Sequence, residues 1–531
     1  MIKISLATLA EITHGELFTA DNQSSHSLDD SAIDDLTIDD LYIDDLVTDS
    51  RAIDENSTKV SAFLALKGPS FDGHRFAQQV IEQGCQLLIV DHHLHAVTNT
   101  PQLVVSDTRI ALGKIAAFVK KELAPKTVGI TGSSGKTTVK EMVAAILSRL
   151  GKVLATQGNF NNDIGVPLTL LRLDRSHDFA VIEMGANHIG EIAYTTGLTQ
   201  PDVAVINNIA AAHLEGFGDL CGVARAKGEI FSGLGEKGVA IYNQDTKYTN
   251  KWQWRLTDKT VRTFSCFSTG ADKAHCYSEN INLDESGCAS FTLKTELGSC
   301  EVNLTIPGKH NVCNAVAAAC IALEFGASLE DITLGLAQMQ PVKGRLNLYQ
   351  LHDKTSGCNI KLIDDSYNAN LESAKAAAQL LSSYPGKQLL ILGDMGELGS
   401  EARSYHQELG EFAKNLQLNT LLSLGVLSQS ASDAFAQNND KNELSQHFSQ
   451  RNDLMAHLLT MLNEQLAAGQ QDIAILVKGS RSAHMEHVVT EIMHWFEQMN
   501  SQQSTSQESC ANESNASKNQ ASENQSKEGK A

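Results

Sequence analysis

Short apolar runs recur along most of the chain and alternate with stretches of helical periodicity. A continuous apolar run of about four to eight residues is typical of a strand that is buried on both faces. Strands that alternate with helices predict parallel sheets covered by helices, so we expect an α/β fold. The runs that we interpret as buried strands are residues 63–66, 87–90, 180–182, 203–206, 239–242, 361–363, 389–392, 421–424 and 473–477.

The most informative segment covers residues 127–138. A short apolar strand over 127–130 is followed by a turn that contains Gly132 and Gly135, and then by a helical pattern. A strand, a glycine turn and a helix N-terminus form a cradle for phosphate, because exposed N–H groups and the helix dipole face the anion. The apolar residues of the helical pattern share one face, and they are Val139, Met142, Val143, Ile146, Leu147 and Leu150.

The cradle carries the side chains that a nucleotide site needs. Lys136 would reach the β- and γ-phosphates of a nucleotide, and the Thr137 hydroxyl would hold Mg²⁺. The usual P-loop spacing requires glycine at position 130, where this chain has isoleucine. The alternative is a glycine-rich turn that binds nothing, but the strand and the helix on the correct sides argue against it.

Three further residues follow the strands of this region. Glu183 comes at the end of a strand beside the cradle, where a carboxylate can hold Mg²⁺ directly or through water. His213 follows the next strand and is either a metal ligand or a satisfied polar residue. Lys227 lies in a helical stretch and, taken alone, would be a surface lysine.

A chain of 531 residues is too long to fold around a single hydrophobic core, so we expect three domains. We place a small mixed α/β domain at residues 1–107 and a central parallel-sheet domain with the cradle at 108–340. A second α/β domain, without a P-loop, follows at 341–500. Ligands of open α/β sheets bind at the carboxyl ends of strands. In the last domain those ends carry polar residues at 364–366, 393–394 and 478–480.

Two polar segments fall outside the alternation of strands and helices. An Asp-rich unit recurs every five residues between 28 and 46, and this period suits neither a strand face nor a helix face. We interpret about residues 21–45 as a solvated acidic insertion. A calcium site is the alternative, but the glycine of a calcium-binding loop is missing. Residues 501–531 have almost no apolar side chains and are predicted to be disordered.

Charge, hydropathy and cysteine usage narrow the class of protein. The formal net charge of -21 argues against non-specific nucleic-acid binding. No apolar run approaches the ~18–20 residues of a membrane span, and the N-terminus lacks a signal-peptide pattern. The ten cysteines are scattered and form no C-x-x-C pair. This predicts reduced thiols in a cytoplasmic protein, with neither a disulfide framework nor a zinc site.

Several separated motifs, in order, resemble those of the Mur ligases, the ATP-dependent amide ligases of peptidoglycan synthesis. The motif 131–138 looks like that family's variant of the P-loop, which accounts for the displaced glycine. Several motifs in order are far more specific than one alone, and the resemblance covers about residues 1–500 apart from the acidic insertion. The other shared motifs are 158–167, 183–186, His213 followed by Ala226-Lys227, 308–315, Gly344-Arg345 and 364–370.

The resemblance implies a reaction and its substrates. The terminal carboxylate of a UDP-N-acetylmuramoyl-tripeptide would attack the γ-phosphate of ATP, and the amine of D-alanyl-D-alanine would attack the resulting acyl phosphate. Residues 48–51, 65–68 and 71–74 look like the uridine-nucleotide domain of the family, and 393–399 and 477–481 look like its C-terminal, Rossmann-like domain. The member that adds the third residue of the peptide carries an Asp-Asn-Pro-Arg signature, which does not occur here.

The resemblance also implies the role of each site residue. ATP would contact Gly132, Ser133, Ser134, Gly135, Lys136, Thr137 and Thr138 through its phosphates, with Asn311 at the adenine, Asp365 at the ribose and Arg345 at the phosphates. One Mg²⁺ ion would lie on Thr137 and Glu183, and a second on His213 and a carbamylated Lys227. Carbamylation turns a cation into an anionic oxygen ligand, the type that Mg²⁺ prefers. The nucleotide-peptide substrate would contact Ser50, Arg51, Lys67, Asp72, Gly73, His74, Asn161 and Asn162.

Rival interpretations are another Mur-type ligase, a folylpolyglutamate synthetase on the same architecture, and a P-loop protein that uses hydrolysis as a switch. The uridine-domain motifs and residues 478–481 argue against the synthetase, and the second α/β domain argues against the switch. The sequence leaves open whether the third residue of the acceptor is lysine or diaminopimelate. It also leaves open the base for the incoming amine and the purpose of the acidic repeat and polar tail. We expect a monomer.

Overall fold

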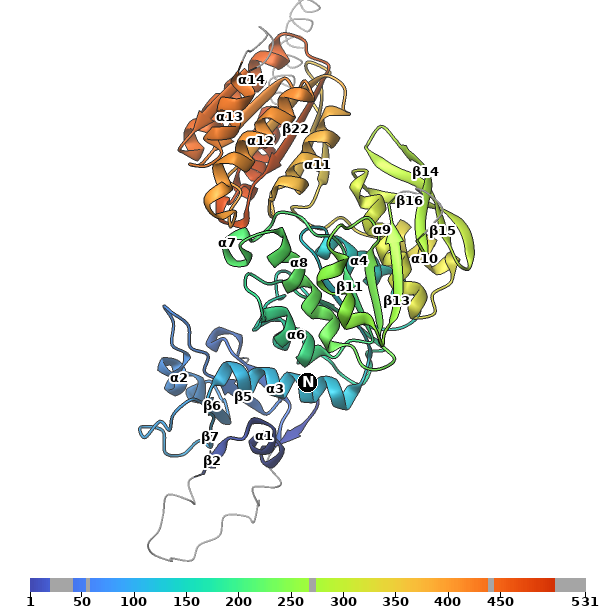
Figure 1. The fold of residues 1–531 in the computed structure, drawn as a ribbon. Helices are drawn as coiled ribbons and strands as arrows, with labels where there is room; N and C mark the ends of the chain where they lie inside the picture. The colour runs from blue at the N-terminus through green and yellow to red at the C-terminus, as the bar shows by residue number, and fades with distance from the viewer. Residues whose placement is uncertain (20–41, 54–57, 267–273, 438–443, 502–531) are drawn as a thin grey trace, which may run out of the picture.

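The computed structural model describes residues 1–19, 42–53, 58–266, 274–437 and 444–501 (Figure 1). The chain passes from a small N-terminal unit, blue in the figure, through a central unit to a C-terminal unit in orange and red. Each unit is built on a β-sheet flanked by helices, which confirms the predicted three-domain α/β architecture. Within these residues, no helix has both the length and the apolar character needed to cross a bilayer.

The N-terminal unit contains a five-stranded sheet in the order β2-β7-β6-β5-β4 and a two-stranded sheet of β1 and β3. Strands β4 to β7 are parallel, and β2 pairs antiparallel with β7. The elements are β1 (Ile4–Ser5), α1 (Leu6–Thr13), β2 (Glu16–Phe18), β3 (Tyr42–Ile43), β4 (Asp45–Val47), η3 (Ser50–Ala52), β5 (Ser61–Leu64), η4 (Gly73–Phe76), α2 (Ala77–Glu82), β6 (Leu87–Val90) and β7 (Gln102–Val104).

The acidic insertion ends earlier than the sequence pattern indicates. Its expected end near residue 45 is wrong, because β3 and β4 belong to the N-terminal unit. Ile43 is fully buried and pairs with Ile4, while Asp44 accepts a hydrogen bond of 2.8 Å from the Val60 N–H. The last copy of the repeat therefore supplies a core side chain. The copies up to residue 41 lie outside the described residues, as does the predicted disordered tail from residue 502 on.

The central unit is built on a nine-stranded sheet in the order β16-β15-β14-β13-β12-β11-β8-β10-β9. All pairs from β9 to β14 are parallel, whereas β14, β15 and β16 pair antiparallel. Its strands are β8 (Lys126–Thr131), β9 (Val153–Ala155), β10 (Phe179–Glu183), β11 (Val203–Ile206), β12 (Val239–Asn243), β13 (Thr260–Ser265), β14 (Cys276–Leu283), β15 (Cys288–Thr295) and β16 (Gly298–Pro307). Its helices are α3 (Thr108–Leu123), α4 (Lys136–Leu147), α5 (Gly165–Leu170), α6 (Glu191–Thr199), α7 (Leu214–Phe217), α8 (Leu220–Gly228), η5 (Glu229–Gly233), η6 (Thr249–Lys251), η7 (Gln253–Leu256), α9 (His310–Glu324) and α10 (Leu329–Ala337).

Helices cover both faces of the central sheet around its inner parallel strands, so β10 and β11 are buried along their whole length. Along β10, Ala180 and Ile182 enter one core with α3 and α6, while Val181 enters the other core with α4 and α9. This is why such strands appear in the sequence as continuous apolar runs. The predicted face of α4 is buried as far as Leu147. Leu150 lies beyond the end of the helix and is 38% exposed.

The C-terminal unit contains a six-stranded sheet in the order β17-β18-β22-β19-β20-β21. Only β17 is antiparallel to its neighbour; the other pairs are parallel. The elements are β17 (Asn347–His352), β18 (Asn359–Asp365), α11 (Leu371–Ser382), β19 (Lys387–Gly393), η8 (Gly399–Glu401), α12 (Ala402–Asn415), β20 (Thr420–Leu424), α13 (Gln429–Ala436), β21 (Leu444–Phe448), α14 (Arg451–Ala467), β22 (Asp472–Lys478), η9 (Arg481–Ala483) and a last helix over 486–501.

Candidate nucleotide and ligation site

A cavity of about 1670 Å³ lies between the central and the C-terminal units. The carboxyl ends of β8, β10 and β11 face it from the central unit, and the ends of β18 and β22 face it from the C-terminal unit. The predicted site residues that line it are Ser133, Ser134, Gly135, Lys136, Thr137, Thr138, Asn161, Asn162, Glu183, His213, Asn311, Arg345 and Asp365. Residues from seven separate motifs therefore meet in one place.

The phosphate cradle has the geometry that an anion needs. Gly135 has φ +74° and precedes α4, and a Cβ at this position would lie 2.5 Å from Asn314 Oδ1. Both the left-handed backbone and the close approach therefore require glycine. No side chain caps the N-terminus of α4. The N–H groups of its first turn consequently remain available for phosphate oxygens, and the residues present fit a nucleotide.

The side chains beside the cradle form one hydrogen-bonded cluster. Thr137 Oγ1 donates to Glu183 Oε2 at 2.9 Å, and Asn161 Nδ2 donates to Glu183 Oε1 at 2.8 Å. Arg345, from the C-terminal side of the cavity, donates to Thr137 Oγ1 at 3.0 Å. Hydroxyl and carboxylate oxygens are ligands that Mg²⁺ prefers, so Thr137 and Glu183 fit this ion.

Lys136 lies within the cradle, where its Nζ donates to the Gly132 carbonyl at 2.8 Å. Desolvation lowers the pKa of Lys136, and the nearby Glu183 carboxylate opposes that shift. Gly132 itself does not line the cavity, and its carbonyl serves instead to orient the lysine. The Lys136 side chain is thus held in place before any phosphate arrives.

Lys227, on α8, is fully buried and is not among the residues that line the cavity. Its Nζ has no hydrogen-bond partner among the described residues. Burial holds the pKa of Lys227 well below the usual range of a lysine; Lys136 lowers it further, while Glu191, Glu229 and Glu183 raise it. The nearby Glu229 does not pair with Lys227; its carboxylate instead accepts hydrogen bonds from the backbone N–H groups of Gly190 and Ala193.

His213 contacts a residue that the sequence did not single out for the site. Its Nδ1 lies 2.5 Å from Glu397 Oε2, which comes from the loop after β19 in the C-terminal unit. The hydrogen bond from His213 holds the pKa of Glu397 below its usual range. Glu397 also lines the cavity. The sequence did contain a signal for Glu397, because this residue lies in the motif 393–399, but no role in the site had been assigned to that motif.

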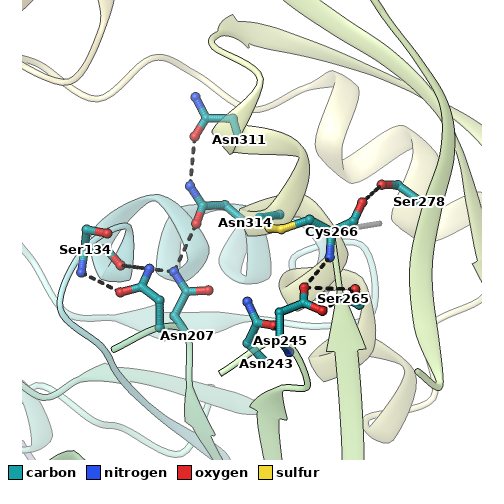
Figure 2. Close-up of a disulfide and its surroundings, with 11 residues drawn as sticks. Ser134, Asn207, Asn243, Asp245, Ser265, Cys266, Ser278, Asn311 and Asn314 are labelled. Carbon is teal, nitrogen blue, oxygen red and sulfur yellow. Dashed lines mark hydrogen bonds between the residues drawn. A yellow bond between two sulfur atoms is a disulfide. The ribbon is translucent and has the colours of Figure 1, made fainter. Parts of the chain in front are cut away.

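A relay of asparagines connects the far end of the cavity to the cradle (Figure 2). Asn314 Nδ2 donates to Asn311 Oδ1 at 2.9 Å, and Asn207 Nδ2 donates to Asn314 Oδ1 at 3.0 Å. Asn207 Nδ2 also lies 3.1 Å from the Ser134 carbonyl, which accepts from it. Residues of α9 are thereby linked to the phosphate loop. The sequence did not single out Asn207 and Asn314 as site residues, although Asn207 directly follows the strand β11 and Asn314 lies in the motif 308–315.

On the C-terminal side, Asp365 is engaged by a lysine. Lys478 Nζ lies 2.5 Å from Asp365 Oδ2 and donates to the Asn368 carbonyl at 2.9 Å. Burial raises the pKa of Asp365, and the Lys478 and Arg345 cations oppose that shift. Lys478 is only 2% exposed, so it orients the end of β18 from inside the protein.

The predicted uridine-binding residues form a separate group on the N-terminal unit and do not line the cavity. His74 is buried; its Nδ1 lies 2.7 Å from Asp72 Oδ1, and its Nε2 accepts the Asp91 N–H at 3.1 Å. Arg51 forms an exposed pair with Asp49 at 2.7 Å. The remaining members of this group are Ser50, Lys67 and Gly73.

Two cysteines at the cavity depart from the expectation of reduced thiols. Cys266, directly after β13, and Cys313, in the first turn of α9, are joined as a disulfide (Figure 2). The expectation is therefore wrong for this pair, because residues far apart in the sequence meet in the fold. The other described cysteines are free.

Two family models match the chain. The Mur ligase middle domain matches residues 130–322, and the Mur ligase, glutamate ligase domain matches residues 344–481. The UDP-N-acetylmuramoyl-tripeptide–D-alanyl-D-alanine ligase of Escherichia coli K12 is 45% identical over 92% of this chain and 98% of its own length. The similarity thus extends across all three units.

Solved structures agree with these matches. A crystal structure of MurF from Acinetobacter baumannii has a TM-score of 0.81 and 37% identity, covering 93% of this chain and 99% of its own. MurF ligase from Thermotoga maritima, solved in complex with ADP, has a TM-score of 0.72 and 25% identity, covering 86% of this chain and 98% of its own.

Proposed function

The chain belongs to the Mur ligase family, and on that premise we infer that it joins D-alanyl-D-alanine to a UDP-N-acetylmuramoyl-tripeptide with ATP. The products are ADP, phosphate and the UDP-muramoyl-pentapeptide precursor of peptidoglycan. Similarity to ligases of this activity over nearly the whole chain carries the conclusion. The cavity, with its uncapped helix N-terminus and clustered cations, supplies a place for the reaction.

We propose that each of the three units has its own role in the reaction. Residues 1–107 bind the uridine nucleotide, 108–340 bind ATP, and 341–500 complete the site over the cradle. Support for this assignment comes from the position of the cradle on the central sheet. It also comes from the contacts of Arg345 with Thr137 and of Glu397 with His213. We further propose that the protein acts as a monomer in the bacterial cytoplasm.

The first half of the reaction brings two anions together. The terminal carboxylate of the tripeptide attacks the γ-phosphorus of ATP; the bond to the β-γ bridging oxygen breaks, and ADP leaves. Lys136, Arg345 and the N–H groups of α4 offset the charge repulsion of this encounter. Thr137 and Glu183 would hold Mg²⁺, which supplies further charge neutralisation on the phosphates.

The second half forms the amide. The amine of D-alanyl-D-alanine attacks the acyl carbon, a C–N bond forms, the C–O bond to phosphate breaks, and phosphate leaves with its electron pair. The amine nitrogen loses one proton, which balances the charge of the released phosphate. Water would hydrolyse the acyl phosphate, so the C-terminal unit must cover the cradle during this step. The contact between His213 and Glu397 is one of the contacts that hold the two units together.

We propose that Lys227 is carbamylated and, with His213, holds a second Mg²⁺. The buried Nζ, which has no hydrogen-bond partner within the described part of the chain, supports this assignment, because only a neutral amine attacks carbon dioxide, and burial favours the neutral form. The amine nitrogen forms a bond to the carbon of CO₂ and loses one proton, which leaves an anionic carbamate. The carbamate would offer negatively charged oxygen atoms to Mg²⁺, whereas a free lysine ammonium would repel the ion.

Phosphate release tests the proposed function directly. With purified full-length protein and Mg²⁺-ATP, release should require both a UDP-muramoyl-tripeptide and D-alanyl-D-alanine. Lysine-containing and diaminopimelate-containing acceptors, compared side by side, would identify the third residue. Release at an equal rate without the dipeptide, or with a folate acceptor in place of the nucleotide, would contradict the assignment.

A further inference from the structure

We propose that Cys266 and Cys313 form a reversible thiol–disulfide pair that adjusts the affinity of the cavity for ATP. The two residues are 47 positions apart in the sequence, but their Cα atoms lie 4.8 Å apart. This separation falls within the range of about 4.4–6.8 Å that disulfides use. No backbone movement is therefore needed to form the bond.

Both sulfurs are accessible from the cavity. Cys266 and Cys313 are partly exposed and belong to its lining, close to Asn311. By contrast, Cys85, Cys276 and Cys320 are buried. A small thiol reagent can therefore enter the cavity and reach the pair, whereas buried thiols are inert.

The bond connects two walls of the nucleotide site. Cys266 is the first residue after β13. Its N–H lies 3.4 Å from Asp245 Oδ2, and its carbonyl accepts a hydrogen bond from the Ser278 hydroxyl (Figure 2). Cys313 belongs to the first turn of α9, between Asn311 and Asn314. The disulfide thus fixes this turn against the carboxyl end of β13.

The effect reaches the phosphate loop through the asparagine relay. Asn314 lies directly after Cys313 and accepts from Asn207, which in turn donates to the Ser134 carbonyl. When the bond is reduced, the two sulfurs separate to van der Waals contact, and the first turn of α9 is free to shift. Binding ATP must then order this turn, so we expect weaker binding in the reduced form.

The exchange needs an oxidant, for which a low-molecular-weight disulfide such as oxidised glutathione suffices. One cysteine thiolate attacks the reagent, forming a mixed disulfide and releasing one thiol; the second thiolate displaces the other thiol. Two electrons and two protons pass to the released thiols, and excess reduced thiol reverses the reaction. In a reducing compartment, disulfides are commonly of this transient, redox-sensing kind.

The test compares two redox states of the full-length protein. One sample is treated with dithiothreitol and another with oxidised glutathione, and both are then freed of reagent. Alkylation followed by peptide mass spectrometry should find the Cys266–Cys313 bond only in the oxidised sample. Calorimetry with Mg²⁺-ATP alone should give a dissociation constant roughly threefold to tenfold higher in the reduced sample.

Variants assign the effect to the pair. Cys313→Ser and Cys266→Ser should each bind ATP like the reduced protein in both conditions, while Cys300→Ser should keep the redox dependence. Thermal melts of all three would show that each is folded. Equal dissociation constants in the two states of the wild-type protein, or no bond between the two residues after oxidation, would overturn the proposal. It rests on the ATP site of the proposed function, but neither readout requires ligation, so failure of ligation would count against that function alone.

Discussion

At the scale of single residues, two lysines in the same region of the central unit have different environments. Lys136 has a carbonyl partner and faces the cavity, whereas Lys227 is fully buried and its Nζ has no hydrogen-bond partner among the described residues. Each amine lies close enough to Glu183 for its pKa to respond to that carboxylate. We therefore expect opposite chemistry from the two amines: one acts as a cation, the other as a nucleophile toward carbon dioxide.

Lys136→Ala should abolish most ligation and leave the fold intact. The variant loses the cation that offsets charge at the γ-phosphate, which costs about 3–4 kcal/mol of transition-state stabilisation, or roughly 10²–10³-fold in turnover. Steady-state kinetics and a thermal melt measure the two effects, with Lys237→Ala, an exposed lysine, as the control. Near-normal turnover by folded Lys136→Ala protein would show that the cradle is misassigned.

Lys227 should carry a carbamate in the active enzyme. Protein equilibrated with ¹³C-bicarbonate should give a carbamate carbon resonance that is lost in Lys227→Ala, together with ligation. High bicarbonate should partly restore the activity of that variant if a small acid occupies the vacated space. An active wild-type protein without the resonance would contradict the assignment, because the second metal site would then lack its proposed ligand.

At the scale of elements, buried strands were predictable and half-buried strands were not. The apolar runs at 87–90 and 203–206 coincide with β6 and β11, since both faces of these strands are covered. The antiparallel β16 alternates buried and exposed residues along much of its length, so it shows no continuous apolar run. The strand β3 was also not predictable, because it lies in the acidic repeat, whose five-residue period matches neither a strand nor a helix. Ile43, in the last copy of the repeat, nevertheless enters the core.

Close helix packing in the central unit depends on one glycine. A Cβ at Gly335, on α10, would lie 2.6 Å from the Cα of Ile146 on α4. Gly335→Ala must therefore push the two helices apart, and we expect a loss of about 1–3 kcal/mol in the free energy of unfolding. Gly197→Ala, on α6, is the matched control because nothing lies within 4 Å of its new methyl group. Urea unfolding compares them; equal stability of the two variants would refute the close contact.

At the scale of the whole molecule, the site is assembled from two units, by residues that are distant in the sequence. The cradle was predictable because strand, turn and helix are consecutive. Lys478 and Glu397 were not. Lys478 reaches Asp365 only because β22 pairs with β18 across more than 100 residues of sequence, and Glu397 reaches His213 only where the C-terminal unit contacts the central unit. Spacing along a chain carries no information about such contacts. Its position at the end of a strand pointed to Lys478, and a family motif contained Glu397.

Docking of the C-terminal unit should depend measurably on the contact between Glu397 and His213. The Glu397 side chain is 52% exposed, so the pair should contribute about 0.2–1 kcal/mol, the usual range for exposed pairs. Arg345 to Thr137 and Asn370 to the Ser133 carbonyl are further contacts across the same interface. Removing Glu397 should therefore loosen the interface without abolishing it.

For Glu397→Ala, we expect a larger radius of gyration by small-angle X-ray scattering and about a twofold to fivefold lower kcat/KM for ATP. Glu401→Gln, an exposed residue of η8 in the same loop region, is the control and should change neither value. The two measurements separate docking from chemistry. A variant with normal scattering but strongly reduced turnover would show that Glu397 acts on the substrates themselves, whereas normal values for both would show that the remaining contacts alone close the site.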